Sequence, residues 1–380
     1  MPHSSSSLDI VFIGLAITSS WGNGHATTYR SLVKGLGRRG HRVTFLEQDR
    51  PWYAQHRDQP RSAHCETQLY ADVEDLQRRF LALIRNADAV IVGSYVNEGR
   101  RICDWVLREA RGVRAFYDID TPVTLRGVRD DSCKYLAAGQ IAAFDLMLSF
   151  TGGPTLSVLE ETFGARRAAA LYCSVDVDEY RPQRIEPSLA LAYMGTYSDD
   201  RQPGVEAFLN EPARALPEQR FMVVGAQYPK TIAWPANVEH REHLAPDRHA
   251  RFYASQRFTL NVTREDMRAA GYSPSVRLFE AAACGTPIIS DAWPGLAEIF
   301  RPGDEIVVVQ RSEEVIDCLQ FMSDAERTRL AARARERAVA EHSSARRAEE
   351  LERCILEARV PHRNLGGIGA LETRAVGSVL

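Results

Sequence analysis

Short apolar runs alternate with segments of helical periodicity along this chain, and no other sequence feature constrains its fold as strongly. Apolar residues recur one helical turn apart over roughly 26–36, between the first two runs. Short, continuously apolar runs are typical of strands buried on both faces of a parallel sheet. In the first half we expect strands at Leu8–Gly14, Arg42–Glu47, Ala87–Val92, Arg114–Asp118, Asp145–Ser149 and Ala169–Cys173. The first half is therefore predicted to be a doubly wound α/β domain.

The segment RPQRIEP at 181–187 interrupts both periodicities, and the alternation then starts afresh. A chain of 380 residues exceeds the roughly 250 residues that one hydrophobic core usually serves. Further strands are expected at Leu189–Met194, Arg220–Gly225, Phe258–Thr263, Pro287–Asp291 and Glu305–Gln310. We predict two Rossmann-like domains facing a cleft, at 1–184 and 185–342. Residues 343–380 form a C-terminal helix and tail that could pack back on the first domain, and 323–359 is expected to form two helices broken near 342–344.

Composition excludes several classes of protein. Hydrophobic residues make up 44% of the chain and charged residues 26%, and no run approaches the ~18 apolar residues of a membrane span. The polar N-terminus lacks the features of a signal peptide, so we expect a cytoplasmic protein without an integral membrane segment. The net charge of −3 argues against a surface given over to polyanions. Seven scattered cysteines without a CxxC pair indicate free thiols rather than zinc or redox chemistry, and we predict no metal site.

The literal GxGxxG motif, Gly35–Gly40, has the wrong context for a dinucleotide site. Such a motif should follow a strand and open a helix, whereas this one closes a predicted helix and leads into a strand. We interpret its glycines as a helix C-cap and turn.

The loop Ser19–His25 after the first strand is a better candidate. Ligands bind open α/β sheets beyond the carboxyl ends of strands, where glycines let them approach the backbone. Trp21, Asn23 and Gly24 are candidate acceptor contacts, and His25 is a candidate catalytic base. A plain tight turn with a capping histidine is the alternative.

Two carboxylates end another predicted strand and should reach the same rim. Asp120 is a candidate catalytic base, and Asp118 could orient an acceptor hydroxyl. We add Tyr95, beyond the run Ala87–Val92, to the candidate acceptor contacts. Aspartate before Thr-Pro is also a common cap of a helix or turn, which is the competing interpretation of Asp120.

In the second half, a glycine-containing loop follows the first predicted strand. Gly195 and Thr196 could offer backbone N–H groups to a diphosphate, with Arg201 as a charged partner. A surface turn with a solvated arginine is the alternative. Thr263, at the end of another predicted strand, is a further candidate for the same rim.

The strongest signal is the segment Ser273–Asp291. A Ser-Pro-Ser turn, with Ser273 and Ser275, opens a helix that carries Arg277 and Glu280, and Cys-Gly-Thr-Pro ends it before a strand. The i, i+3 spacing places Arg277 and Glu280 on one face, where they could bind a phosphate and two ribose hydroxyls. A surface ion pair is the competing interpretation.

This segment resembles the donor-site helix of the GT-B glycosyltransferases, whose hallmark is Glu-x7-Glu followed by Ala-x-Ala-Cys-Gly-Thr-Pro. Glu280 corresponds to the second glutamate, and 281–287 follow the pattern. Tyr272 stands in the place of the first glutamate. The form Gly-Tyr-Ser-Pro-Ser-x-Arg-x-Phe-Glu is similar to the subgroup typified by spore-maturation glycosyltransferases.

The resemblance implies a nucleotide-diphosphate sugar donor, foremost a UDP-sugar, held by the second domain, and an acceptor held by the first. Glu280 would contact the ribose, while Gly195, Thr196 and Arg277 would hold the diphosphate. The family implies neither metal nor cofactor. An inverting enzyme would need His25 or Asp120 as its base, whereas in a retaining enzyme the leaving phosphate can take the acceptor proton.

Other functions remain open on the sequence. A nucleotide-sugar epimerase shares this fold, and a non-catalytic nucleotide-sugar-binding protein would keep the loops without a chemical role for His25 and Asp120. The acceptor could be a sugar, lipid, small molecule, protein or modified nucleic-acid base. We expect the first-domain loops Trp52–Cys65 and Arg126–Tyr135 to decide among them.

Overall fold

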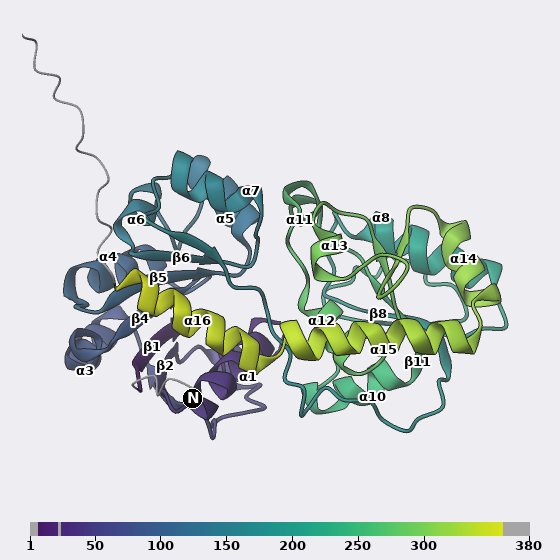
Figure 1. The fold of residues 1–380 in the computed structure, drawn as a ribbon, viewed down its shortest axis with the longest axis horizontal. Coiled ribbons are helices and arrows are strands. Elements are labelled where there is room, and N and C mark those ends of the chain that lie inside the picture. Colours follow the sequence, from purple (N-terminus) through teal and green to yellow (C-terminus); the bar gives the residue numbers. More distant parts are fainter. Residues whose placement is uncertain (1–6, 22–23, 360–380) are drawn as a thin grey trace, which may run out of the picture.

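Two α/β domains lie side by side in the computed structural model, which describes residues 7–21 and 24–359 (Figure 1). The first domain is built on a seven-stranded, all-parallel sheet in the order β3-β2-β1-β4-β5-β6-β7. Its strands are β1 (Asp9–Gly14), β2 (Arg42–Gln48), β3 (Glu66–Tyr70), β4 (Ala89–Gly93), β5 (Val113–Asp118), β6 (Leu146–Ser149) and β7 (Ala168–Ala170).

The second domain repeats this arrangement with six parallel strands in the order β10-β9-β8-β11-β12-β13. These are β8 (Leu189–Met194), β9 (Phe221–Val224), β10 (Val238–Arg241), β11 (Gln256–Asn261), β12 (Ile288–Asp291) and β13 (Val307–Val309). In each sheet the strand order reverses beside the first strand, between β1 and β4 and between β8 and β11. Such reversals are where open α/β sheets bind ligands. The prediction of two Rossmann-like domains is confirmed.

Helices cover both faces of each sheet. The first domain contains α1 (His25–Arg38), α2 (Pro51–Ala54), α3 (Val73–Asn86), α4 (Gly99–Glu109), α5 (Thr121–Arg129), α6 (Ala138–Ala143) and α7 (Pro154–Ser157), the last continued by a π-helical turn, Val158–Thr162. The second contains α8 (Gln202–Val205), a π-helical turn (Glu206–Asn210), α9 (Glu211–Ala215), a 3-10 turn (Pro246–Arg248), α10 (His249–Ala254), α11 (Glu265–Ala270), α12 (Val276–Ala283), α13 (Leu296–Ile299), α14 (Ser312–Phe321) and α15 (Asp324–Glu341).

The sequence pattern missed two strands, and both lie at a sheet edge. The sequence of β3 is ETQLY and that of β10 is VEHR, and only one residue of each is buried. Edge strands are half solvated, so they lack the continuous apolar run from which the central strands were predicted. Of the glycines in the GxGxxG motif, Gly40 lies in the turn between α1 and β2 at a φ of 87°, as predicted. Gly35 and Gly37 lie within α1, so the prediction of a cap or turn is wrong for these two.

The chain returns to the first domain at its end. Helix α15 lies on the second domain, and α16 (Ser344–Ala358) crosses back to lie against α1 (Figure 1). This confirms two helices with a break near 342–344. Arg359 pairs with Asp88 at 2.5 Å, and Arg39 pairs with Glu352. The helices approach so closely that a Cβ atom on Gly35 of α1 would lie 2.2 Å from the carbonyl oxygen of Ser344.

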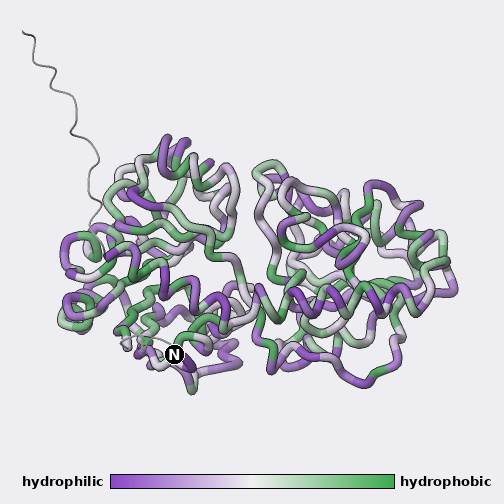
Figure 2. The backbone as a smooth tube through the Cα atoms, viewed as in Figure 1, coloured by the Kyte–Doolittle hydropathy of each residue, from purple (hydrophilic) through white to green (hydrophobic). Residues whose placement is uncertain are grey.

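Apolar side chains are buried in the interior of both domains. Figure 2 shows hydrophobic stretches along the strands of each domain, whereas much of the helical surface is hydrophilic. One cluster of buried apolar residues runs from β1 through the domain contact to α12 and α16. All seven cysteines are free thiols, as expected, and five of them are buried. None of the helices in the described ranges is long and apolar enough to cross a membrane.

The contact between α1 and α16 predicts that Gly35→Ala destabilises the protein. The added methyl group would meet backbone atoms of Ser344 and the Cβ of Ala348, so the helices must move apart. We expect a loss of about 1–3 kcal/mol in the free energy of unfolding, measured by urea denaturation. Gly139→Ala is the matched control, because a Cβ there meets nothing within 4 Å and alanine favours its helix. Equal stabilities of the two variants would contradict the close packing.

Candidate functional site

Residues beyond the carboxyl ends of strands in both sheets line one cavity of about 360 Å³ between the domains. The first domain contributes the loop after β1 and the start of α1, with His25, and the loop after β5, with Asp120. The second domain contributes the loops after β8 to β11 and the first turns of α12. Both topological switch points therefore open into the same space.

Arg277 is the central cation of the second-domain wall. Its side chain enters from the first turn of α12, and the residue is only 6% exposed. Nη1 donates to Asn261 Oδ1 at 2.8 Å, Nε donates to the carbonyl of Met194, and the guanidinium lies 4.6 Å from the centre of the Tyr193 ring. All three partners are neutral, and no carboxylate of the described chain forms an ion pair with Arg277.

The absence of a side chain on Gly195 leaves space for the guanidinium of Arg277. A Cβ on Gly195 would lie 2.7 Å from Arg277 Nη2 and 2.5 Å from the Tyr193 hydroxyl. The neighbouring glycine is equally constrained, because a Cβ on Gly225 would lie 1.9 Å from the carbonyl oxygen of Gly195. At the ends of β8 and β9, the cavity is therefore lined by the backbone of Gly195 and Gly225.

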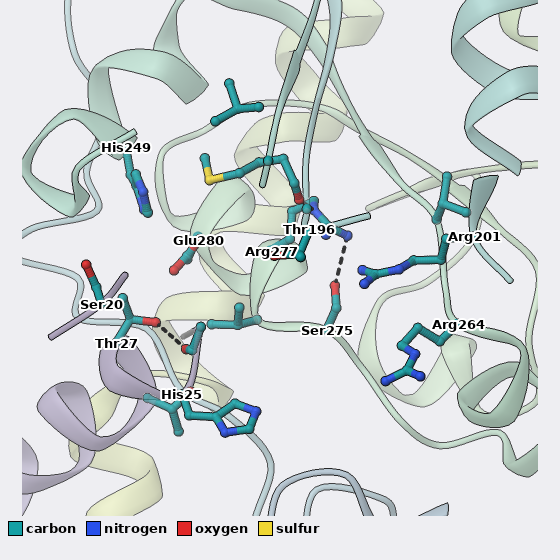
Figure 3. A pocket seen from close by; sticks show the side chains of 18 of the residues that line it. Ser20, His25, Thr27, Thr196, Arg201, His249, Arg264, Ser275, Arg277 and Glu280 are labelled. Carbon is teal, nitrogen blue, oxygen red and sulfur yellow. Dashed lines mark hydrogen bonds between the residues drawn. The ribbon is translucent and has the colours of Figure 1, made fainter. Parts of the chain in front are cut away.

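Two further arginines line the cavity beside Arg277 (Figure 3). Arg201 is oriented by a hydrogen bond from Nε to Ser198 Oγ at 2.9 Å. Arg264 lies 3.6 Å from the carboxylate of Asp200, measured from its Nε. Thr196, Thr263 and Ser275 line the same region. This part of the cavity is cationic and offers hydroxyl groups.

Glu280 lies one turn further along α12 and is 4% exposed. Tyr253 donates a hydrogen bond to Glu280 Oε2 at 2.9 Å. Burial, and secondly the charge of Glu280, raises the pKa of Tyr253 and of Tyr180. The two phenols therefore stay protonated, and the carboxylate is fixed at the cavity wall. In Figure 3 Glu280 lies on the side of the cavity nearer His249.

His25 and Asp120 face the cavity from the first domain. Burial lowers the pKa of His25, opposed by the nearby charge of Asp120, so the imidazole is neutral at pH 7. Tyr95 donates a hydrogen bond from its hydroxyl to Asp120 Oδ2 at 2.8 Å. Tyr95 is held at a φ of 65°, an uncommon conformation for a non-glycine residue. His25 and Asp120 could each accept a proton, and Tyr95 could also take part in proton transfer.

Asp118, Trp21 and Tyr95, all singled out from the sequence, do not line this cavity. Asp118 is buried, and its Oδ1 accepts from Thr124 Oγ1 at 2.8 Å. Burial raises the pKa of Asp118 to about 7. Trp21 stacks on His56 at 4.4 Å and meets His243 of the second domain at 4.6 Å between ring centres. Asn23 lies outside the described residues.

Tyr272, in the place of the first glutamate of the motif, does not line the cavity. Its carbonyl accepts a hydrogen bond from Gly152 N at 2.9 Å, which joins the two domains. Its ring fills the space over two glycines, since a Cβ on Gly153 or on Gly295 would lie 2.4 Å from it. Next to it, Thr151 Oγ1 donates to Ser273 Oγ at 3.0 Å. Tyr272 therefore packs in the domain contact.

The cavity includes residues that the sequence did not single out. Arg264 directly follows the candidate Thr263, so the same strand-end argument could have found it. Glu242, His243 and Leu244 follow β10, a strand that was not predicted, and so carried no signal. In the described part of the chain, no group of three histidine, cysteine or acidic residues is arranged to hold a metal ion.

Comparison with known proteins identifies the fold. Residues 201–353 match the family model described as glycosyl transferase-like. A search of curated protein sequences finds no significant match. A sucrose-phosphate synthase from Thermosynechococcus elongatus matches the structure with a TM-score of 0.67 at 14% identity, covering 92% of this chain and 98% of that one.

Two further structures are similar. Anabaena HepE in complex with UDP-glucose gives a TM-score of 0.67 at 12% identity. An alpha-glucosyltransferase in complex with UDP-glucose and DNA containing an abasic site gives 0.69 at 13% identity. Both matches cover 92% of this chain and 100% of the other. These likenesses establish the GT-B fold for the chain.

The burial of Asp118 predicts a specific dependence of stability on pH. Its pKa of about 7 in the folded protein lies above the value of ~3.9 expected for an unfolded chain. Its contribution to stability is therefore greatest below about pH 4 and is lost as the pH rises through 7. We expect Asp118→Asn to gain stability relative to wild type as the pH rises from about 4 to about 7, by up to about 1.4 kcal/mol per pH unit, with no further gain above that.

Urea denaturation at several pH values measures this difference directly. Asp130→Asn serves as the control, since Asp130 is exposed and its variant should follow the wild type at every pH. Parallel stability curves for Asp118→Asn and the wild type would show that Asp118 titrates normally.

Proposed function

Because the chain carries a glycosyl transferase-like domain on a GT-B fold, we propose that it transfers a sugar from a nucleoside-diphosphate donor to an acceptor hydroxyl. The donor binds the second domain, and the acceptor reaches the cavity from the first. The complexes of HepE and of the alpha-glucosyltransferase with UDP-glucose support a UDP-sugar as donor.

The buried, unpaired charge of Arg277 is the observation that carries the proposal. Removing an ion from water costs several kcal/mol unless an opposite charge compensates, and the partners of Arg277 are all neutral. A diphosphate in the cavity would supply that charge. The N-terminus of α12 adds its dipole and free N–H groups at the same place.

Other side chains accommodate the rest of the donor. Arg201 and Arg264 are positioned for the outer phosphate oxygens. Glu280, fixed by Tyr253, can accept hydrogen bonds from two adjacent ribose hydroxyls. Residues 242–244 also line the cavity and would contact the nucleobase.

Transfer breaks the bond between the anomeric carbon and the diphosphate oxygen and forms a bond from that carbon to the acceptor oxygen. The electron pair of the broken bond leaves with the diphosphate, where the arginines stabilise the charge. The acceptor proton goes to Asp120 or to the neutral imidazole of His25 if the configuration inverts, and to the leaving phosphate if it is retained. Because Tyr272 replaces the glutamate, neither outcome is assigned.

Donor binding is tested by a thermal-shift screen against UDP-, GDP-, TDP- and ADP-sugars. We expect at least one of them to raise the melting temperature, because a ligand that binds only the folded state stabilises it. The absence of a shift with all four would refute the nucleotide-sugar site.

Arg201→Met should weaken binding of the stabilising nucleotide sugar by about 10- to 100-fold, the loss expected for a charged hydrogen bond to phosphate. Isothermal titration calorimetry measures the dissociation constant. Arg220→Met is the control on the same domain, because Arg220 is exposed, precedes the start of β9 and does not line the cavity. Equal effects of the two substitutions would mean that Arg201 does not contact the donor.

Asp120→Asn should lower turnover by about 100-fold or more while donor affinity changes little, if Asp120 is the general base. Release of the nucleoside diphosphate in the presence of acceptor gives the rate, and Asp130→Asn is the exposed control. Full activity in both Asp120→Asn and His25→Ala would instead support proton transfer to the leaving phosphate. Sugar exchange without an acceptor would indicate an epimerase, and donor binding without turnover a binding protein.

A further inference from the structure

A second cavity, of about 610 Å³, lies in the first domain at the carboxyl ends of β1, β2, β3 and β4. Both loops expected to select the acceptor contribute to it, through Trp52 and Tyr53 on one side and through 126–135 on the other. A single small molecule fits a space of this size, since ligand pockets usually span ~300–1,000 Å³.

Tyr95 separates this cavity from the one between the domains. The residue lines the second cavity, while its hydroxyl is hydrogen-bonded to Asp120, which lines the first. A molecule held in the second cavity is therefore one side chain away from the proposed base.

Two buried polar atoms of residues lining the second cavity have no hydrogen-bond partner among residues 7–21 and 24–359. These are the hydroxyl of Tyr70, a residue that is 1% exposed, and Oε1 of Gln48. Leaving such groups unpaired is costly, and unpaired groups in native proteins usually have a ligand or functional reason. Tyr70 and Gln48 are the last residues of neighbouring strands, so both reach the same edge of the sheet.

Part of the cavity wall is aromatic, beside charged residues such as Arg50, Glu98 and Lys134. Tyr53, Tyr70, Tyr95 and Tyr135 line it, and the rings of Tyr95 and Tyr135 lie 4.9 Å apart in a tilted arrangement. Trp52 is 61% exposed, an unusual exposure for so large an apolar ring. Aromatic side chains arranged in this way favour the faces and edges of another planar ring.

Building on the proposed transferase function, we propose that the acceptor is a small planar aromatic molecule bearing at least two polar groups. Its rings lie among the tyrosines, and one hydroxyl or amine group pairs with the Tyr70 hydroxyl and Gln48 Oε1. A second hydroxyl faces Asp120 and receives the sugar.

Tyr70→Phe tests this assignment without removing any hydrogen bond present in the free protein. Binding of a panel of one- to three-ring phenols is measured by calorimetry on the full chain saturated with the nucleoside diphosphate. We expect some phenols to bind, and Tyr70→Phe to weaken their binding about 5- to 20-fold, the loss of one hydrogen bond. The melting temperature and the donor affinity should not fall.

Tyr29→Phe is the matched control. The Tyr29 hydroxyl is also buried and without a hydrogen-bond partner, but Tyr29 lines neither cavity. Removing it should leave phenol affinity unchanged, which separates a contact with the acceptor from a general effect of deleting a buried hydroxyl.

The proposal is overturned if no phenol in the panel binds, if Tyr70→Phe and Tyr29→Phe bind phenols equally, or if turnover occurs with glucose, maltose or a lipid alcohol and not with phenols. Donor affinity is measured in the same samples. Intact donor binding with any of these results refutes only the aromatic acceptor, whereas the absence of donor binding refutes the transferase function itself.

Discussion

The buried positive charge of Arg277 is the interaction on which the second-domain wall of the cavity depends. Its guanidinium is held by the end of β8, through Met194, and the end of β11, through Asn261. Those two strands flank the switch point of the sheet. The side chain of Arg277 therefore connects the loop after β8 to the loop after β11. The geometry leaves no room for a side chain on Gly195 or on Gly225. Neutral groups therefore position the positive charge of Arg277.

The substitution of a glutamate by Tyr272 changes what this part of the motif does. Tyr272 does not line the cavity, and its backbone and ring connect the two domains through Gly152 and Gly153. Because both glycines follow β6 of the first domain, the donor helix is coupled directly to the opposite domain. Under the proposed function, recognition of the transferred sugar falls to other groups, and Thr196, Arg264 and Ser275 line the cavity.

The sequence predicted the features that depend on local pattern. Buried central strands have continuous apolar runs, and the helix carrying Arg277 and Glu280 has a distinctive ending, so both could be found from the sequence. The edge strands β3 and β10 could not, because half of their surface is solvated and their residues are polar. The residues after β10 were missed for the same reason, as was Tyr70 of the second cavity, which ends β3.

Some properties of the site arise only from three-dimensional packing. Asp118 and Asp120 are two residues apart at the end of one strand, yet one is buried under the rim and the other faces the cavity. The spacing of the two aspartates in the sequence does not predict which one is buried. The second domain begins near 189, but the first is completed only by α16, which covers α1 around Gly35. During synthesis the ribosome must therefore add the whole second domain before α1 is covered, a delay of roughly 10–30 s at ordinary elongation rates. Throughout that interval the nascent first domain exposes an apolar face, which makes it a natural client for chaperones.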